Sequence, residues 1–267
     1  MARAALHFWE EPCISGEKGS GAVFFSGCAL HCVFCQNENI ANGTAGKVIS
    51  TARLCEIFLE LQEKGANNIN LVTPGQFAPQ IIKAVELARD QNLTIPIVYN
   101  TSSYENVDTI RSLEGIVDIY LPDFKYQDAA LSAKYSHAPD YPSVAKEAIK
   151  EMVRQTGEAV FENGEDSLMK RGTIVRHLIL PGCTKDSKAV LSYLHETYGN
   201  EIYISIMHQF TPLSNVKKYP ELNRRITERE YNEVVDFAID IGIENGFIQD
   251  GETAEESFIP EFDNEGV

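Results

Sequence analysis

Residues 26–37 read Ser-Gly-Cys-Ala-Leu-His-Cys-Val-Phe-Cys-Gln-Asn and contain three of the chain's six cysteines, Cys28, Cys32 and Cys35. The apolar run 22–25 precedes them and predicts a strand that delivers the cysteines from its carboxyl end. Thiolates spaced C-x3-C-x2-C suit one soft metal centre, either an iron–sulfur cluster or a zinc ion. Three thiolates leave one iron of a four-iron cluster without a protein ligand, and an open position distinguishes a reactive metal site from a closed structural one.

Other arrangements of the cysteines remain open at this point. A closed zinc site needs a fourth ligand, and the candidates are His31, Cys13, Cys55 and Cys183. No second C-x-x-C pair is present to build a zinc ribbon. A redox pair made of Cys32 and Cys35 alone would leave Cys28 without a role.

Composition narrows the class of protein. The chain has 267 residues, 43% of them hydrophobic, which is enough for one large α/β domain with a substantial core. Its net charge of −16 and its lack of basic clusters disfavour a nucleic-acid partner. No stretch reaches membrane-spanning length, because residues 9–12 (Trp-Glu-Glu-Pro) interrupt the apolar N-terminus. Six cysteines without a secretion signal indicate a reducing compartment, and we expect a cytoplasmic protein.

Apolar runs alternate with amphipathic helical patterns along the chain, as in βα units around a parallel sheet. Six strands are predicted, at residues 22–25, 69–72, 95–99, 116–121, 174–180 and 202–207. Six units are too few for a closed eight-stranded barrel and predict an α/β fold, a (β/α)6 partial TIM barrel with its chemistry at the carboxyl ends of the strands. We expect a single domain: an N-terminal segment 1–20, the barrel over 21–246 with a small insertion at about 157–172 before strand five, and an acidic tail 247–267.

Local signals predict several element ends. Ser50 is a candidate N-cap for a helix with an apolar face, and Pro79 suits the first turn of the next helix. Capping-box spacing occurs at Ser102–Glu105 and again at Thr227–Glu230. Asn163-Gly164 predicts a hairpin turn within the insertion.

The cysteine motif, with Phe34 before its last cysteine, resembles the signature of the radical S-adenosylmethionine (SAM) enzymes. The order of motifs over residues 21–212 is similar to that of the pyruvate formate-lyase activating enzyme and its relatives, which activate glycyl radical enzymes. The strings 8–16 (Phe-Trp-Glu-Glu-Pro-Cys-Ile-Ser-Gly), 24–28 (Phe-Phe-Ser-Gly-Cys) and 32–37 (Cys-Val-Phe-Cys-Gln-Asn) resemble a branch related to that activase. Relatives in this branch often carry a cysteine-rich N-terminal extension, and the present chain starts 27 residues before Cys28.

The resemblance implies ligands for a [4Fe-4S] cluster and for SAM. Cys28, Cys32 and Cys35 would bind the cluster, whose open iron would chelate SAM, and the Phe34 backbone would meet the adenine. The stretch 73–76 (Thr-Pro-Gly-Gln) stands where the superfamily has a Gly-Gly-Glu loop that contacts the SAM amino group. This chain keeps one glycine there, and Gln76 replaces the usual acid, so Thr73, Gly75 and Gln76 are candidate contacts through carbonyl oxygens.

Further SAM contacts are expected where the later strands end. Asn100 and Ser102 follow strand three, and Asp123 and Lys125 follow strand four, where the activases have Asp-Leu-Lys. Arg176 lies within an apolar strand, and a buried guanidinium needs a partner, for which the SAM carboxylate is suitable. Its neighbour His177 should face away from the site. His208 lies close to the activases' Pro-Tyr-His stretch and is the last candidate.

The resemblance implies an enzyme that reductively cleaves SAM to a 5′-deoxyadenosyl radical for hydrogen abstraction. Within this family the hydrogen would come from a glycine of a glycyl radical enzyme. Its reductant would be a flavodoxin or ferredoxin. A radical SAM enzyme acting on a small molecule or another peptide is the alternative within the same class. A non-catalytic protein that binds an iron–sulfur cluster or SAM is the alternative from another class.

Overall fold

The computed structural model describes residues 1–162, 167–248 and 262–267. Within these residues nine strands form one sheet with the order β1-β2-β3-β4-β5-β7-β8-β9, and β6 pairs with β7 alone. All neighbours from β2 to β9 along this path are parallel, whereas β1 is antiparallel to β2. The strands are β1 (Arg3–His7), β2 (Ser20–Phe24), β3 (Ile69–Val72), β4 (Ile97–Thr101), β5 (Ile119–Pro122), β6 (Val160–Phe161), β7 (Met169–Leu178), β8 (Tyr203–Met207) and β9 (Gly246–Ile248).

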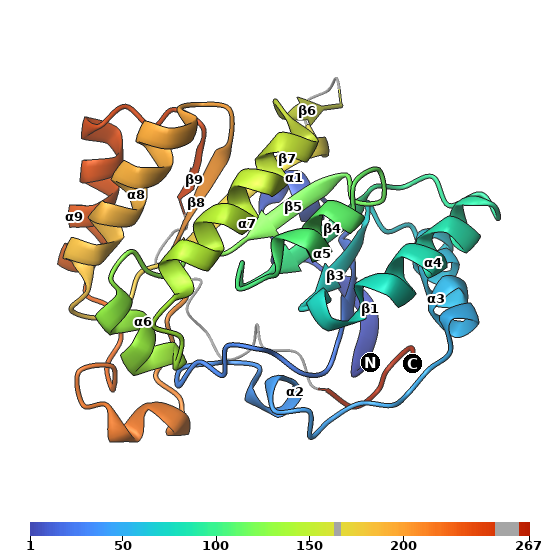
Figure 1. Ribbon diagram of the computed structural model, residues 1–267, viewed down its shortest axis with the longest axis horizontal. Helices are drawn as coiled ribbons and strands as arrows, with labels where there is room; N and C mark the ends of the chain where they lie inside the picture. The colour runs from blue at the N-terminus through green and yellow to red at the C-terminus, as the bar shows by residue number, and fades with distance from the viewer. Residues whose placement is uncertain (163–166, 249–261) are drawn as a thin grey trace.

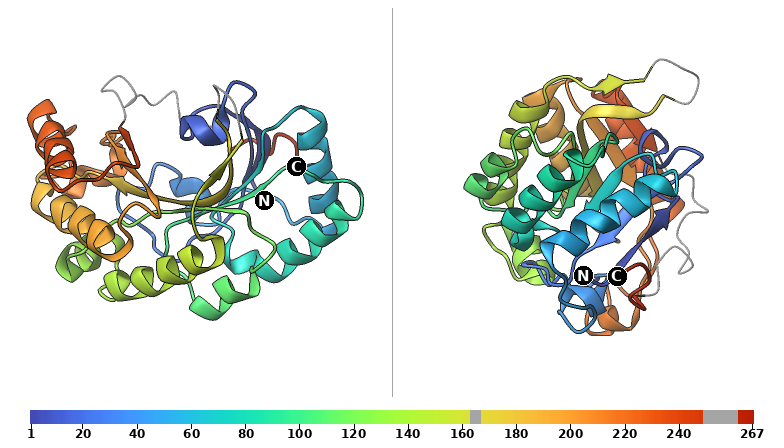
Figure 2. Two further views of the ribbon diagram at one scale, coloured as in Figure 1. Left: turned by 90° about the horizontal axis from the view of Figure 1, so that it is seen from above. Right: turned by 90° about the vertical axis from the view of Figure 1, so that its right-hand side faces the viewer.

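The long helices lie on the convex side of the curved sheet, and a short helix, α1, lies on its concave side (Figures 1 and 2). The α-helices are α1 (Pro12–Ser15), α2 (Glu38–Ala41), α3 (Thr51–Glu63), α4 (Ala78–Arg89), α5 (Val107–Ser112), α6 (Ala129–Ser136), α7 (Tyr141–Thr156), α8 (Thr184–Tyr198) and α9 (Glu228–Asp240). Two 3-10 helices, η1 (Gly75–Phe77) and η2 (Ser214–Lys218), complete the set in the described residues. The predicted partial barrel is therefore confirmed, with six βα strands and extra strands at both edges. None of these helices is long and apolar enough to cross a membrane.

The starts of three helices, α3, α4 and α9, follow the predicted local signals. The Ser50 side chain accepts a hydrogen bond from the Arg53 amide at the start of α3. Pro79 lies in the first turn of α4, and α9 begins with the predicted capping box of Thr227 and Glu230. These signals work because they satisfy backbone N–H groups that have no partner inside the helix.

The capping box predicted at Ser102 and Glu105 is wrong. Helix α5 begins after Asn106, whose side chain accepts from the Asp108 amide. Glu105 instead accepts a hydrogen bond from the Thr101 hydroxyl at 2.6 Å. A buried hydroxyl at the end of β4 thus competes successfully for the carboxylate that the capping box needs.

The ends of the chain contribute more structure than the sequence predicts. The N-terminal segment 1–20 contains β1 and α1, and β9 begins at the boundary of the predicted tail. Residues 262–267 lie beside β1: the Asn264 amide donates to the Ala2 carbonyl, and the Ala4 amide donates to the Glu265 carbonyl. The Phe262 ring packs edge-on against Phe24. The two termini are therefore neighbours (Figure 1).

The predicted insertion is in part a short antiparallel pair, β6 with β7. Its proposed turn at Asn163-Gly164 lies outside the described residues. Helix α6, which the sequence analysis does not predict, follows β5 and packs beside α7.

The interior of the partial barrel is filled at one end and hollow at the other. Cys13 and Ile14 of α1 pack against inward-facing side chains of the central strands, among them Val98, Leu121 and Ile174. This apolar cluster closes the inside of the sheet beneath α1. Polar side chains take over where the parallel strands end, and a cavity opens there.

Candidate functional site

The three clustered cysteines line one cavity of about 260 Å³ at the carboxyl ends of the strands. The loop that carries them leaves β2 through Gly27, whose φ of 102° favours glycine. The Gln76 side chain donates to the carbonyls of Ser26 and Gly27, both at 2.9 Å. The Val33 amide donates to the Tyr135 carbonyl of α6. Neighbouring elements on both sides therefore fix the loop.

The donor set fits an iron–sulfur cluster with one open iron. All six cysteines are free thiols, and burial raises the pKa of Cys35 to about 12 and also raises that of Cys32. A bound metal centre would supply the positive charge that ionises them. The Ser136 hydroxyl donates to the Cys32 sulfur at 3.0 Å, a contact of the kind that tunes cluster potentials.

The proposed fourth ligands for zinc are not brought to this loop. His31 is exposed and its Nδ1 faces the Asn42 amide oxygen. Cys13 and Cys55 lie in separate apolar clusters, and Cys183 is not part of the cavity lining. In the described part of the chain, no three His, Cys, Asp or Glu side chains are grouped closely enough for a single metal ion. The geometry therefore favours a cluster over a closed zinc site.

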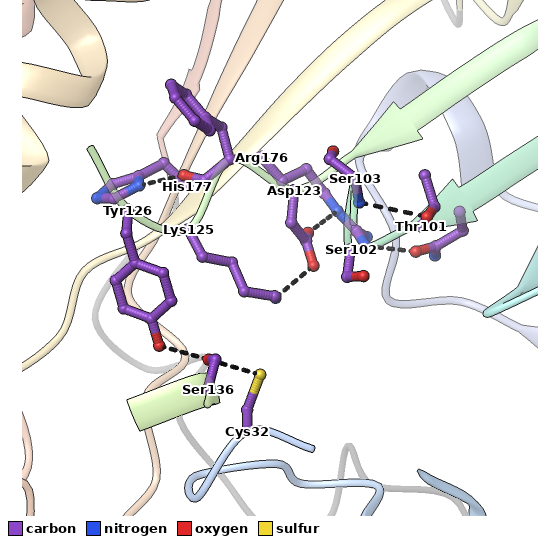
Figure 3. A network of polar contacts seen from close by, with 12 residues as sticks. Cys32, Thr101, Ser102, Ser103, Asp123, Lys125, Tyr126, Ser136, Arg176 and His177 are labelled. Atoms are coloured by element: carbon purple, nitrogen blue, oxygen red, sulfur yellow. Dashed lines mark hydrogen bonds and ion pairs between the residues drawn. The ribbon is translucent and has the colours of Figure 1, made fainter. Parts of the chain in front are cut away.

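Arg176 is the centre of a buried charge network on one wall of the cavity (Figure 3). Its Nη1 donates to Glu10 at 2.9 Å, its Nη2 to the Asn100 amide oxygen at 2.6 Å, and its Nε to Asp123 at 3.2 Å. The Lys125 ammonium binds the other Asp123 oxygen at 2.6 Å. Burial opposes ionisation of Asp123, yet Lys125 and Arg176 outweigh it and hold the pKa of this carboxyl below its usual range.

Strand register brings this network together. Asp123 and Arg176 form a parallel bridge where β5 and β7 end, and the Phe124 amide donates to the Arg176 carbonyl. Side chains alternate along a strand, so His177 points to the other face, where its Nδ1 meets the Phe124 carbonyl. Burial lowers the pKa of His177 to about 4, so the imidazole is neutral. Arg176 alone of the pair lines the cavity, as the sequence predicts.

The structure brings together most of the predicted contact residues. Besides the cysteines, those that line the cavity are Thr73, Asn100, Ser102, Asp123, Lys125 and Arg176. The other four, Phe34, Gly75, Gln76 and His208, are not among the lining residues.

Each of these four has a different environment. The Phe34 ring is buried beside Phe210, and the His208 ring packs edge-on against Tyr231. A Cβ on Gly75 would collide with the Glu105 carboxylate, so a larger residue cannot stand there without movement. Gln76 makes the two hydrogen bonds to the cysteine loop.

The sequence analysis missed the residues that the N-terminal segment contributes. His7, Trp9, Glu10 and Glu11 all line the cavity. The string Phe-Trp-Glu-Glu-Pro was the available signal, because adjacent acids beside a proline follow an apolar strand directly. Ser136 of α6, which contacts Cys32, had no comparable signal.

Comparisons with known proteins agree with this geometry. Residues 14–138 match the model of a family described as a 4Fe-4S single cluster domain. An uncharacterized protein of Methanocaldococcus jannaschii is 26% identical over 244 residues, which are 87% of this chain and 65% of that protein.

Two solved structures have the same fold. SuiB of Streptococcus suis, bound to S-adenosylmethionine, aligns with a TM-score of 0.56 at 12% identity, over 86% of this chain and 50% of its own. The structure of native anSMEcpe with bound AdoMet also aligns with a TM-score of 0.56 at 12% identity, over 82% of this chain and 60% of its own. The chain thus spans about half to two thirds of the length of these relatives. The chain is therefore similar to a 4Fe-4S single cluster domain over residues 14–138, and it shares its partial-barrel fold with these two structures.

Proposed function

We propose that this chain is a radical SAM enzyme in which Cys28, Cys32 and Cys35 hold a [4Fe-4S] cluster and SAM binds beside it. One observation carries the proposal: three free thiols and a buried charge network line the same cavity at the carboxyl ends of parallel strands. Ligands of open α/β sheets bind at this edge.

When bound, the reduced cluster and SAM supply a 5′-deoxyadenosyl radical for hydrogen abstraction. The chain's own residues bind and orient. Thr73 at the end of β3, and Asn100 and Ser102 at the end of β4, offer polar groups to the methionine and ribose parts of SAM. Arg176 holds Asp123 in place, and Lys125 lies between Asp123 and Cys32 in the network of Figure 3. Because α1 and the apolar side chains around it fill the barrel interior at the end opposite the cavity, water has little access from that end.

This assignment changes the proposed role of Arg176. Its three nitrogens already have protein partners, so we propose that it positions Glu10 and Asp123 rather than binding the SAM carboxylate directly. Gln76 likewise supports the cysteine loop, and its part in SAM binding is indirect.

The identity of the substrate is a separate proposal. The motif order favours activation of a glycyl radical enzyme, with a flavodoxin or ferredoxin as reductant in the reducing cytoplasm. Another peptide or a small molecule is the second candidate, and one observation favours a peptide: structures with this fold include SuiB bound to its precursor peptide SuiA.

The test is anaerobic reconstitution with iron and sulfide, then dithionite reduction with SAM and an assay for 5′-deoxyadenosine. We expect production in the wild-type chain and none in Cys32→Ala. The matched control is Cys183→Ala, which removes a thiol outside the cavity and should retain production. A bound cluster without SAM cleavage would support a non-catalytic SAM-binding or electron-transfer protein, and uptake of zinc alone would overturn the cluster assignment.

A further inference from the structure

The connection between β1 and α1 places two adjacent carboxyl groups in the cavity wall, and they differ in their partners. Glu10 accepts hydrogen bonds from Arg176 at 2.9 Å, from Asn70 at 2.9 Å and from Asn100 at 3.3 Å. Glu11 is only 6% exposed and lines the same cavity, yet its Oε2 has no hydrogen-bond partner among the described residues. The polar group near this carboxyl is the hydroxyl of Ser205 on β8, which lowers the pKa of Glu11 although no hydrogen bond joins the two side chains.

The Glu11 side chain is not needed to form α1. Its backbone carbonyl accepts from the amides of Ile14 at 2.8 Å and Ser15 at 3.0 Å, whereas its carboxyl makes no capping bond. A buried polar group without a partner lowers stability, because it loses its hydrogen bonds to water and gains none within the protein. Such groups are rare in folded proteins and call for a functional explanation.

The charges around Glu11 balance without it. Glu10 and Asp123 are negative, Arg176 and Lys125 are positive, and the four form one hydrogen-bonded set. His7 also lines the cavity, and burial lowers its pKa. Burial raises the pKa of Glu11, while Arg176 and Ser205 oppose this rise. A cation that enters the cavity would favour the ionised form of this carboxyl.

We propose that Glu11 binds a protonated amine of the substrate, next to the SAM site. Trp9, which is 56% exposed, lines the same cavity, and an indole ring attracts cations. A carboxyl and an indole in the lining of one cavity suit an alkylammonium group. This inference rests on the proposed function only in calling the ligand a substrate.

The first test measures binding of n-butylammonium to the reconstituted chain by calorimetry, with n-butanol as the neutral analogue of equal length. The wild-type chain should bind the ammonium and not the alcohol. Glu11→Gln should bind the ammonium at least about tenfold more weakly, since a hydrogen bond to a charged group contributes about 1.5–3 kcal/mol. Equal binding by Glu11→Gln, or equal binding of the alcohol, would overturn the proposal.

Asp186→Asn is the matched control. Burial raises the pKa of Asp186 to about 6, yet this residue binds the amides of Gln127 and Asp128 away from the cavity. Its loss should leave butylammonium binding at the wild-type value. A loss as large as that of Glu11→Gln would mean that any buried carboxyl supports binding through stability alone.

A second measurement does not depend on the folding of a variant. At a pH low enough to protonate Glu11 in the free chain, the infrared carbonyl band of its carboxylic acid should weaken as butylammonium is added, because the cation favours the ionised carboxyl. An unchanged band would contradict the proposal. Cys32→Ala separates the two proposals: it should lose SAM cleavage, which the cluster supports, and keep butylammonium binding, which Glu11 supports.

Discussion

At the level of single residues, Arg176 is buried and paired as predicted, but its partners are protein side chains and not the expected SAM carboxylate. A guanidinium within an apolar strand requires buried acceptors, and the structure supplies three of them from the protein. Two are carboxylates from distant parts of the chain, Glu10 and Asp123. Arg176 therefore joins the N-terminal segment to the carboxyl ends of the strands.

Replacing Arg176 by Gln should lower the free energy of unfolding by about 3–5 kcal/mol, because it leaves buried carboxylates without their cation. Arg111→Gln removes a guanidinium from an exposed pair with Asp108 and should cost about 0–1 kcal/mol. Urea denaturation of the apo chain at neutral pH measures both free energies of unfolding. Similar losses in the two variants would show that the network contributes no more than a surface ion pair.

Ser136 should set the potential of the cluster through its hydrogen bond to Cys32. Ser136→Ala should lower the reduction potential by about 20–60 mV, because the bond favours the more negative reduced state and is worth about 0.5–1.5 kcal/mol. Ser132→Ala on the same helix is the control, since that hydroxyl donates to the Ala129 carbonyl. Redox titration followed by electron paramagnetic resonance measures both. A potential that stays at the wild-type value in Ser136→Ala would remove Ser136 from the cluster environment.

At the scale of elements, the sequence predicted what local periodicity and capping decide. The six parallel strands, the start of α3 and the capping box of α9 all follow from neighbours within a few positions. Strands β1 and β9 were missed because they are the edge strands of the sheet and each is ordered through pairing with its one neighbour, β2 or β8. Glu10 and Glu11 were missed as site residues for the same reason. Their place in the cavity depends on the pairing of β1, which no local pattern reveals.

Gln76 links η1 to the cysteine loop. Replacing it by Glu, the acid of the superfamily's Gly-Gly-Glu loop, should destabilise the cysteine loop and its cluster. In Gln76→Glu the donor to the Ser26 and Gly27 carbonyls is replaced by an acceptor, so we expect faster cluster loss and about 0.5–1.5 kcal/mol less stability. Gln80→Glu, at an exposed position of α4, is the control. The rate of cluster loss to an iron chelator reports the effect. Slower loss in Gln76→Glu would instead support a direct SAM contact by an acid at this position.

At the scale of the whole molecule, the charge of the cavity and that of the chain differ. The buried set of two acids and two bases is balanced, whereas the chain carries a net charge of −16. Reductants that approach from solution experience the overall charge when screening is weak.

Cluster reduction by the dithionite dianion should therefore become faster as ionic strength rises from about 0.01 M to 0.15 M, where the Debye length falls from about 30 Å to 8 Å. Reduction by a cationic reductant, the methyl viologen radical cation, should change in the opposite direction over the same range. Stopped-flow absorbance of the cluster measures both rates. The same direction of change for both reductants would show that the field of the whole chain does not govern access.

The neighbouring termini have a consequence for the order of the chain. Residues 262–267 already lie hydrogen-bonded along β1, so a short linker could close the backbone into a ring with little further loss of chain entropy. New ends could then be opened at an exposed turn such as Gly199, between α8 and β8. The permuted chain would keep β1 between β2 and the former tail, with Glu10 and Glu11 still in the cavity wall. The cavity requires this arrangement of strands in space, but not the order in which the chain connects them.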